Sequence, residues 1–257
     1  MSTPQPGSAA TVLLEDRGPV RILTLNRPEK KNAIDIPMAK ALAAALEGVS
    51  AAPEIKAVIV TGAGEVFTAG VDLHLFMGGQ AEDLPAVTSL HLAIRGCARP
   101  VIAAVNGLAI GMGVTLLPWF DLAYCAEEAS FTIPFVRLGV VPEFGSSALL
   151  PRLIGRQRAA ELILRARAID GRTAESWGLV ARAFPRQRLL AETLAAGEDL
   201  AAGGPEAIRH SRNLLAGGEF AALDDAQAAE WDLLLRCYGS EENQRAARAV
   251  LEKGRSA

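Results

Sequence analysis

Short apolar runs separated by turn-forming residues recur through the first half of the chain. Val20–Leu25 alternates apolar and polar residues, as a half-buried strand does. Ala57–Thr61 and Val101–Val105 are almost entirely apolar, which is typical of strands buried on both faces, and Leu122–Cys125 is a further strand candidate. Asp35–Pro37 carries the residues that begin helices. Short strands that alternate with helices predict an α/β core.

In the last quarter of the chain the pattern changes from strand to helix. Ala, Leu and Arg at helical spacing dominate from about Leu189 to Lys253. Glycines and a proline predict helix breaks at Gly203–Pro205 and at Gly217–Gly218. We therefore predict a core over residues 1–195, with a frayed tail over residues 1–10, and a helical region over residues 196–257.

The charge balance argues against two classes of partner. The net charge is −3 and the sequence pI is about 5.7, so no general attraction to nucleic acid or to an anionic membrane is expected. One uncharged stretch, Pro100–Phe120, is about long enough to span a bilayer. Glycines, an asparagine and a proline interrupt it, which favours a buried strand, a tight loop and a buried helix instead.

Cysteine and histidine usage indicates neither disulfides nor a metal site. The three cysteines are odd in number, widely spaced and free of any CxxC pair, which favours reduced thiols in a cytoplasmic protein. The histidines are equally scattered, so no metal is predicted. These residues are Cys97, Cys125, Cys237, His74, His91 and His210.

Two loops of small residues allow another group to approach the backbone closely. They are Phe67–Asp72 and Asn106–Gly113. Two backbone N–H groups that converge from such loops would form an oxyanion hole; tight turns between packed elements are the plainer alternative. A dinucleotide fingerprint is unsupported because neither GxG in the chain is completed by a third glycine.

A single carboxylate stands in the apolar, Gly/Pro-rich stretch Ile133–Ser147. This is Glu143. A carboxyl group in such surroundings loses solvation, so its pKa tends to rise. A raised pKa would let Glu143 take up and return a proton near neutral pH, whereas a solvated loop glutamate would have no such role.

Taken together, these stretches resemble the crotonase superfamily, also called the enoyl-CoA hydratase/isomerase family. The resemblance runs from about Val12 to Lys253, and the ordered set of motifs is more specific than any one of them. The matching stretches are Leu25–Ala33, Phe67–Asp72, Gly111–Gly113, Ser130–Gly155 and Gly178–Val180.

The resemblance implies a spiral of ββα units and a C-terminal helical region that builds homotrimers, often paired into hexamers. It implies an acyl-CoA thioester as substrate, with coenzyme A as part of that substrate and no separate cofactor. The catalytic groups would be the N–H groups of Ala69 and Met112 and the carboxylate of Glu143. The substrate would contact Lys30, Lys31, Ala33, Phe67, Gly70, Asp72, Leu73, Gly111, Phe135 and Lys253, with the two adjacent lysines as candidates for the phosphates.

The chain departs from the family pattern at the two positions where hydratases carry their glutamates. Thr115 and Phe135 occupy them here, and neither supplies a carboxylate. The series from Pro134 to Ser147 instead resembles the peroxisomal-type 3,2-enoyl-CoA isomerases, in which the glutamate that matches Glu143 is the only base. Asp72 is interpreted as structural, held by loop N–H groups, with a catalytic role as the alternative. The alternatives are a hydratase, another crotonase reaction on an acyl-CoA, or a non-catalytic scaffold that binds RNA or a protein partner.

Overall fold

A computed structural model describes residues 10–75, 84–220 and 223–255 and contains two sheets. The larger sheet has the strand order β1-β2-β3-β5-β7-β10; β1 and β2 pair antiparallel, and every later pair is parallel. Both faces of β3 and β5 are buried, as their apolar sequences predict. The strands are β1 (Val12–Arg17), β2 (Val20–Leu25), β3 (Ala57–Gly62), β5 (Val101–Val105), β7 (Leu122–Ala126) and β10 (Arg182–Phe184).

Three strands of the larger sheet are each followed in the chain by a strand of the smaller sheet. The order of the smaller sheet is β4-β6-β8-β9. The chain therefore passes from β3 to β4, from β5 to β6 and from β7 to β8, which is the alternation expected of a ββα spiral. The strands are β4 (Val66–Thr68), β6 (Leu108–Ile110), β8 (Ser130–Thr132) and β9 (Ile169–Asp170).

Helices cover both sheets, and the helix α1 (Ile36–Glu47) begins where the sequence provides a capping group. The Asp35 carboxylate accepts the Met38 N–H at 2.9 Å and so caps α1, as predicted from Asp35 and Pro37. The helices of the core are α1 (Ile36–Glu47), α3 (Leu84–Thr88), α4 (Leu90–Gly96), α5 (Met112–Thr115), α6 (Ser146–Ile154), α7 (Arg156–Ile163), α8 (Gly171–Trp177) and α9 (Arg186–Ala202). Short 3-10 turns complete them: η1 (Pro28–Lys30), η2 (Gly48–Ala51), η4 (Leu117–Trp119) and η5 (Phe135–Leu138).

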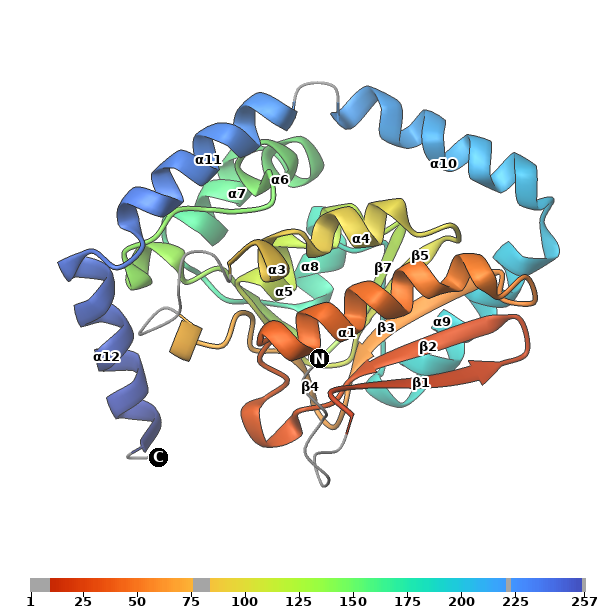
Figure 1. Cartoon of the computed structure of the whole chain (residues 1–257), viewed down its shortest axis with the longest axis horizontal. Coiled ribbons are helices and arrows are strands. Elements are labelled where there is room, and N and C mark those ends of the chain that lie inside the picture. The colour runs from red at the N-terminus through yellow and green to blue at the C-terminus, as the bar shows by residue number, and fades with distance from the viewer. Residues whose placement is uncertain (1–9, 76–83, 221–222, 256–257) are drawn as a thin grey trace, which may run out of the picture.

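Three helices follow the core and arch around it (Figure 1). They are α10 (Pro205–Phe220), α11 (Leu223–Cys237) and α12 (Glu241–Arg255). The break predicted at Gly203–Pro205 is confirmed. The break predicted at Gly217–Gly218 is wrong, because α10 continues through both residues. An interior glycine costs a helix only about 1 kcal/mol, which the neighbouring turns can offset.

The predicted boundary at residue 195/196 falls inside α9. This helix packs along the larger sheet, and Gly197 provides the close approach: an added Cβ would stand 3.0 Å from a methyl group of Val20. α9 therefore packs as part of the core, and the chain leaves the core at Gly203. The predicted tail over residues 1–10 lies outside the described residues except for Ala10.

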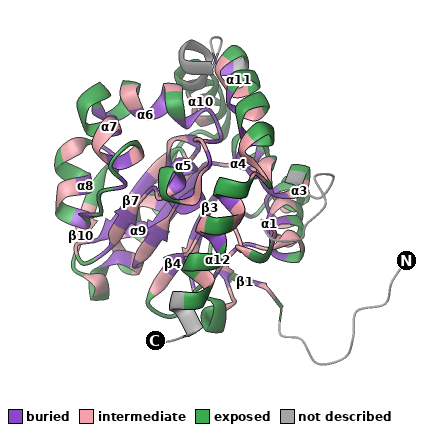
Figure 2. Ribbon diagram, turned by 90° about the vertical axis from the view of Figure 1, so that its left-hand side faces the viewer, coloured by how far each residue is buried: buried purple, intermediate pink, exposed green. Residues whose placement is uncertain are grey.

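Buried residues concentrate in the central strands, whereas exposed residues are common on the surrounding helices (Figure 2). The uncharged stretch Pro100–Phe120 folds as β5, β6, α5 and η4, which confirms the prediction of a buried strand, loop and helix. Within residues 10–75, 84–220 and 223–255, no helix combines the length and apolar character needed to cross a bilayer.

Candidate active site

One cavity of about 720 Å³ brings together most of the residues predicted for the site. It lies between the loop after β4, the start of α5, the η5 segment and α12. Its volume is in the range of small-molecule sites in proteins. The predicted residues that line it are Lys30, Lys31, Ala33, Ala69, Gly70, Asp72, Leu73, Gly111, Met112, Phe135 and Glu143.

Two predicted residues are not among those that line the cavity. Phe67 is only 4% exposed and packs in the hydrophobic core, because consecutive side chains of a strand point to opposite faces. Its prediction as a substrate contact is therefore corrected. Lys253 belongs to α12, but its side chain lies outside the described residues. Val250 and Leu251 of the same helix do line the cavity.

The loop after β4 touches the backbone of the Gly111 loop at Gly70. Gly70 has φ +84°, and an added Cβ would stand 2.6 Å from the Ile110 carbonyl oxygen and 3.5 Å from the Met112 nitrogen. Only glycine allows this approach. The two predicted donor loops therefore meet at one wall of the cavity.

Hydrogen bonds change which N–H group of this loop can serve as a donor. The Ala69 N–H donates to the Lys31 carbonyl at 2.9 Å, so the assignment of the donor to Ala69 is corrected. Around Val71, the Ile34 N–H donates to the Gly70 carbonyl at 2.7 Å and the Asp72 N–H donates to the Ile34 carbonyl at 2.9 Å.

Those two bonds flank Val71, whose own N–H therefore points away from Ile34. In the described part of the chain it has no hydrogen-bond acceptor, and Val71 lines the cavity. The positive φ of Gly70 turns the chain between Ala69 and Val71. The free donor therefore lies two residues beyond the predicted one.

The second loop keeps its predicted donor. Met112 is the first residue of α5, and its N–H has no acceptor among residues 10–75, 84–220 and 223–255. Gly111, with φ +53°, precedes it and packs against the Phe135 ring, which an added Cβ would approach to 3.1 Å. The N–H groups of Val71 and Met112 are therefore both available at the same cavity.

A buried polar network holds the first loop in place. Asn32, which is fully buried, donates through Nδ2 to the carbonyl oxygens of Ala63 (3.0 Å) and Val66 (2.7 Å). The Thr68 hydroxyl donates to the Asn32 carbonyl at 2.7 Å and accepts the Gly70 N–H at 3.0 Å. Asn32 lies in the matching motif Leu25–Ala33, but the sequence does not predict these hydrogen bonds to distant carbonyl groups.

Glu143 combines burial with an unpartnered oxygen. Its side chain lines the cavity and the residue is 8% exposed. Among the described residues Oε1 has no hydrogen-bond partner. Burial, and secondarily the charge of Glu230, raises the pKa of Glu143 to about 8. A proton can therefore be accepted and returned there near neutral pH, in line with the sequence-based expectation.

Neither of the two positions at which hydratases carry glutamates has a carboxylate in this chain. Thr115 is fully buried in α5, and no described residue partners its hydroxyl. Phe135 is 7% exposed and presents a ring to the cavity. Among the described residues that line the cavity, two carboxylates are buried or half-buried. They are Glu143 and Asp72.

Asp72 accepts hydrogen bonds from Arg27 and His74. Its carboxylate accepts from the Arg27 guanidinium at 3.2 Å, and it lies 2.9 Å from His74 Nδ1 and 3.1 Å from the His74 N–H. Burial alone would raise the pKa of Asp72, but the hydrogen bonds from His74 and Arg27 together lower it. Asp72 is therefore held within the loop by hydrogen bonds, one of them from the His74 N–H of the same loop.

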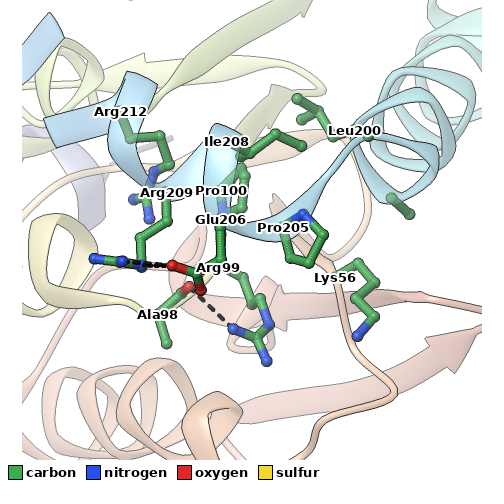
Figure 3. Close-up of a pocket in the computed structure, with 12 residues that line it drawn as sticks. Lys56, Ala98, Arg99, Pro100, Leu200, Pro205, Glu206, Ile208, Arg209 and Arg212 are labelled. Atoms are coloured by element: carbon green, nitrogen blue, oxygen red, sulfur yellow. Dashed lines mark hydrogen bonds and ion pairs between the residues drawn. The ribbon is translucent and has the colours of Figure 1, made fainter. Parts of the chain in front are cut away.

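Figure 3 shows a second, smaller pocket. It measures about 70 Å³ and lies where the turn between α9 and α10 meets Ala98–Pro100. Glu206 and Arg209, which are hydrogen-bonded at 3.2 Å, line it beside Lys56. None of its lining residues also lines the Glu143 cavity. Its volume is well below that of small-molecule sites.

A family model described as enoyl-CoA hydratase/isomerase matches residues 15–257. The chain belongs to the enoyl-CoA hydratase/isomerase family. The resemblance stated from the motifs is thereby confirmed, together with the crotonase fold. In this family the acyl group reaches the enzyme as a coenzyme A thioester, so the cavity described above is the candidate acyl-CoA site.

Individual relatives agree with this assignment and carry different activities in their names. A probable enoyl-CoA hydratase from Rhizobium meliloti is 37% identical over 198 residues, which is 76% of each chain. Enoyl-CoA delta isomerase 2 from Rattus norvegicus is 32% identical over 238 residues, 90% of this chain and 61% of that one. A crystal structure of an enoyl-CoA hydratase/isomerase from Pseudoalteromonas atlantica T6c superimposes with a TM-score of 0.88 at 36% identity, covering 95% and 97% of the two chains.

Proposed function

We propose that this protein is a 3,2-enoyl-CoA isomerase that uses Glu143 as its single base. The observation that carries the proposal is one unpartnered, buried carboxylate at the cavity, with Thr115 and Phe135 at the two hydratase positions. Hydration requires that water be activated and that carbon be protonated, which is difficult without those carboxylates. A double-bond shift needs only one group that moves one proton.

In the proposed reaction Glu143 removes a proton from C2 of a 3-enoyl-CoA. The electrons of that C–H bond form the C1–C2 double bond of a dienolate, and the charge moves onto the thioester oxygen. The Val71 and Met112 N–H groups hold this oxygen, each contributing about 3 kcal/mol. Glu143 then returns the proton to C4, and the double bond lies between C2 and C3.

The remaining lining residues suit the other parts of the substrate. Lys30 and Lys31 are exposed at the rim of the cavity, and neither forms an ion pair within the described residues. We assign them to the phosphates of coenzyme A, for which ammonium groups are suitable ligands. Phe135 and Leu73 supply apolar surface for the acyl group.

The purified protein is therefore expected to convert a 3-enoyl-CoA into the conjugated 2-enoyl-CoA, because one carboxylate and two N–H donors meet the needs of this reaction. The measurement is the rise in absorbance of the conjugated thioester. Hydration is the competing reaction, since the Rhizobium meliloti relative is named a probable hydratase. A protein that formed only 3-hydroxyacyl-CoA would contradict the proposal.

We also propose self-association as a trimer or a dimer of trimers. Leu214 and Leu215 of α10 are 80% and 78% exposed, so this long helix presents apolar surface that a second copy would cover. Sedimentation equilibrium at micromolar concentration is expected to give a multiple of three chains. A stable monomer would contradict it.

A further inference from the structure

The C-terminal helices α11 and α12 form hydrogen bonds to the segment that carries Glu143. Glu230 of α11 is 7% exposed, and both of its carboxylate oxygens are used. Oε2 accepts the Gly145 N–H at 2.7 Å and Oε1 accepts the Ser147 N–H at 2.8 Å. Gly145 is the N-cap of α6 and Ser147 is its second residue, two and four positions after the base.

A second buried polar residue holds the other end of the same segment. Asn243 of α12 is 1% exposed, and its Nδ2 donates to the Leu138 carbonyl at 2.8 Å. Its Oδ1 accepts the Gly239 N–H at 3.1 Å, which fixes the amide. The segment from η5 to α6 is thus bonded to α12 before Glu143 and to α11 after it.

The choice of side chain at Glu230 goes beyond what a helix cap needs. Ser, Thr, Asp or Asn next to the helix would satisfy these N–H groups from within the segment. The chain instead buries a carboxylate from a helix 85 positions away, beside a second buried carboxylate. Charge-assisted bonds from two N–H groups suit an ionised acceptor there. A second negative charge near a base disfavours loss of the proton that the base has taken up.

We propose that Glu230 is a positioning residue for Glu143: it fixes the segment that carries the base through the Gly145 and Ser147 N–H groups and holds a negative charge beside that base. The inference rests on the proposed role of Glu143 as the proton carrier. Through Glu230, α11 would position the base in the active site of its own chain, in addition to any part in self-association.

Other titratable groups line the two cavities that Glu143 lines. His91 of α4 lines, together with Glu143 and Glu230, a cavity of about 410 Å³ beyond the base. Burial and then Glu230 are the causes of the raised Glu143 pKa. The titratable groups that line the active-site cavity are Glu29, Lys30, Lys31, Asp72, His74 and Arg137.

Glu230→Gln tests the proposal because it keeps the size of the side chain and removes its charge. In the native protein, isomerisation should rise with pH to a plateau, with a midpoint near pH 8, since the base must be deprotonated. In Glu230→Gln the midpoint is expected about one pH unit lower. The plateau kcat is expected about tenfold lower, because a weaker base removes the C2 proton more slowly and the amide NH2 group cannot accept one of the two N–H groups.

Asp232→Asn is the matched control. It removes the same charge from the same helix at an exposed ion pair with Arg236, so both the midpoint and kcat should stay native. A Glu230→Gln profile with the native midpoint would overturn the proposal, because a purely structural role lowers the rate without moving the midpoint.

Two further measurements keep the test decisive. The infrared C=O band of protonated Glu143, identified by its loss in Glu143→Gln, reports the same midpoint without turnover. It therefore separates failure of this inference from failure of the isomerase assignment. If Glu230→Gln does not fold, Glu230→Asp decides by the same midpoint: the shorter side chain draws the charge away from Glu143 and cannot reach both N–H groups. A lower midpoint supports the proposal, and a native midpoint overturns it.

Discussion

Glu143→Gln is expected to lower kcat for isomerisation by about 10²–10⁴, with a small effect on KM. Glutamine preserves the shape of the side chain but cannot carry a proton from C2 to C4. Among the described residues that line the cavity, the other half-buried carboxylate is Asp72, which Arg27 and His74 engage. No ready substitute for the base therefore exists there. Steady-state kinetics with a 3-enoyl-CoA measure the effect.

Thr115→Ala is the control for Glu143→Gln. Thr115 is also buried and stands at a position where hydratases carry a glutamate, yet its hydroxyl has no partner among the described residues. Its loss should change kcat much less. Near-native isomerisation by Glu143→Gln would contradict the assignment, and Asp72 would be the first group to examine.

Gly70→Ala is expected to lower kcat/KM by roughly 10²–10³, the usual effect of losing one oxyanion donor. The added Cβ would lie 2.6 Å from the Ile110 carbonyl oxygen, a separation that forces the two loops apart. The N–H groups of Val71 and Met112 would then no longer face one oxygen atom. Kinetics with a 3-enoyl-CoA measure the loss.

Gly64→Ala provides the matched control for backbone strain. Gly64 also has a positive φ, +71°, but nothing lies within 4 Å of an added Cβ. Both substitutions carry the conformational cost of alanine at positive φ, of order 1 kcal/mol, and only one disturbs the donors. Equal losses of activity in the two variants would show that strain alone accounts for the Gly70→Ala effect and would contradict the two-donor arrangement.

The sequence predicted the parts of this fold that depend on local pattern. The alternating pattern at Val20–Leu25 and the apolar run at Val101–Val105 are strands with those bounds, because burial on one or both faces sets their composition. The apolar surroundings of Glu143 also follow from its neighbours along the chain. Local pattern therefore sufficed for the central strands and for the environment of the base.

Features that depend on backbone direction or distant contacts could not be predicted in this way. Whether Ala69 or Val71 offers a free N–H depends on the turn at Gly70, since the Lys31 carbonyl captures the first of them. The contact of Glu230 with Gly145 joins positions 85 residues apart, and no local pattern marks it.

The most direct test of the account compares two reactions on one preparation of the native protein. The rates of 3-enoyl-CoA isomerisation and of 2-enoyl-CoA hydration are measured with acyl chains of equal length. With Glu143 as the single base and Thr115 and Phe135 at the hydratase positions, isomerisation should exceed hydration by at least about 10², the contribution of one missing acid–base group. Hydration that equals or exceeds isomerisation would contradict the account.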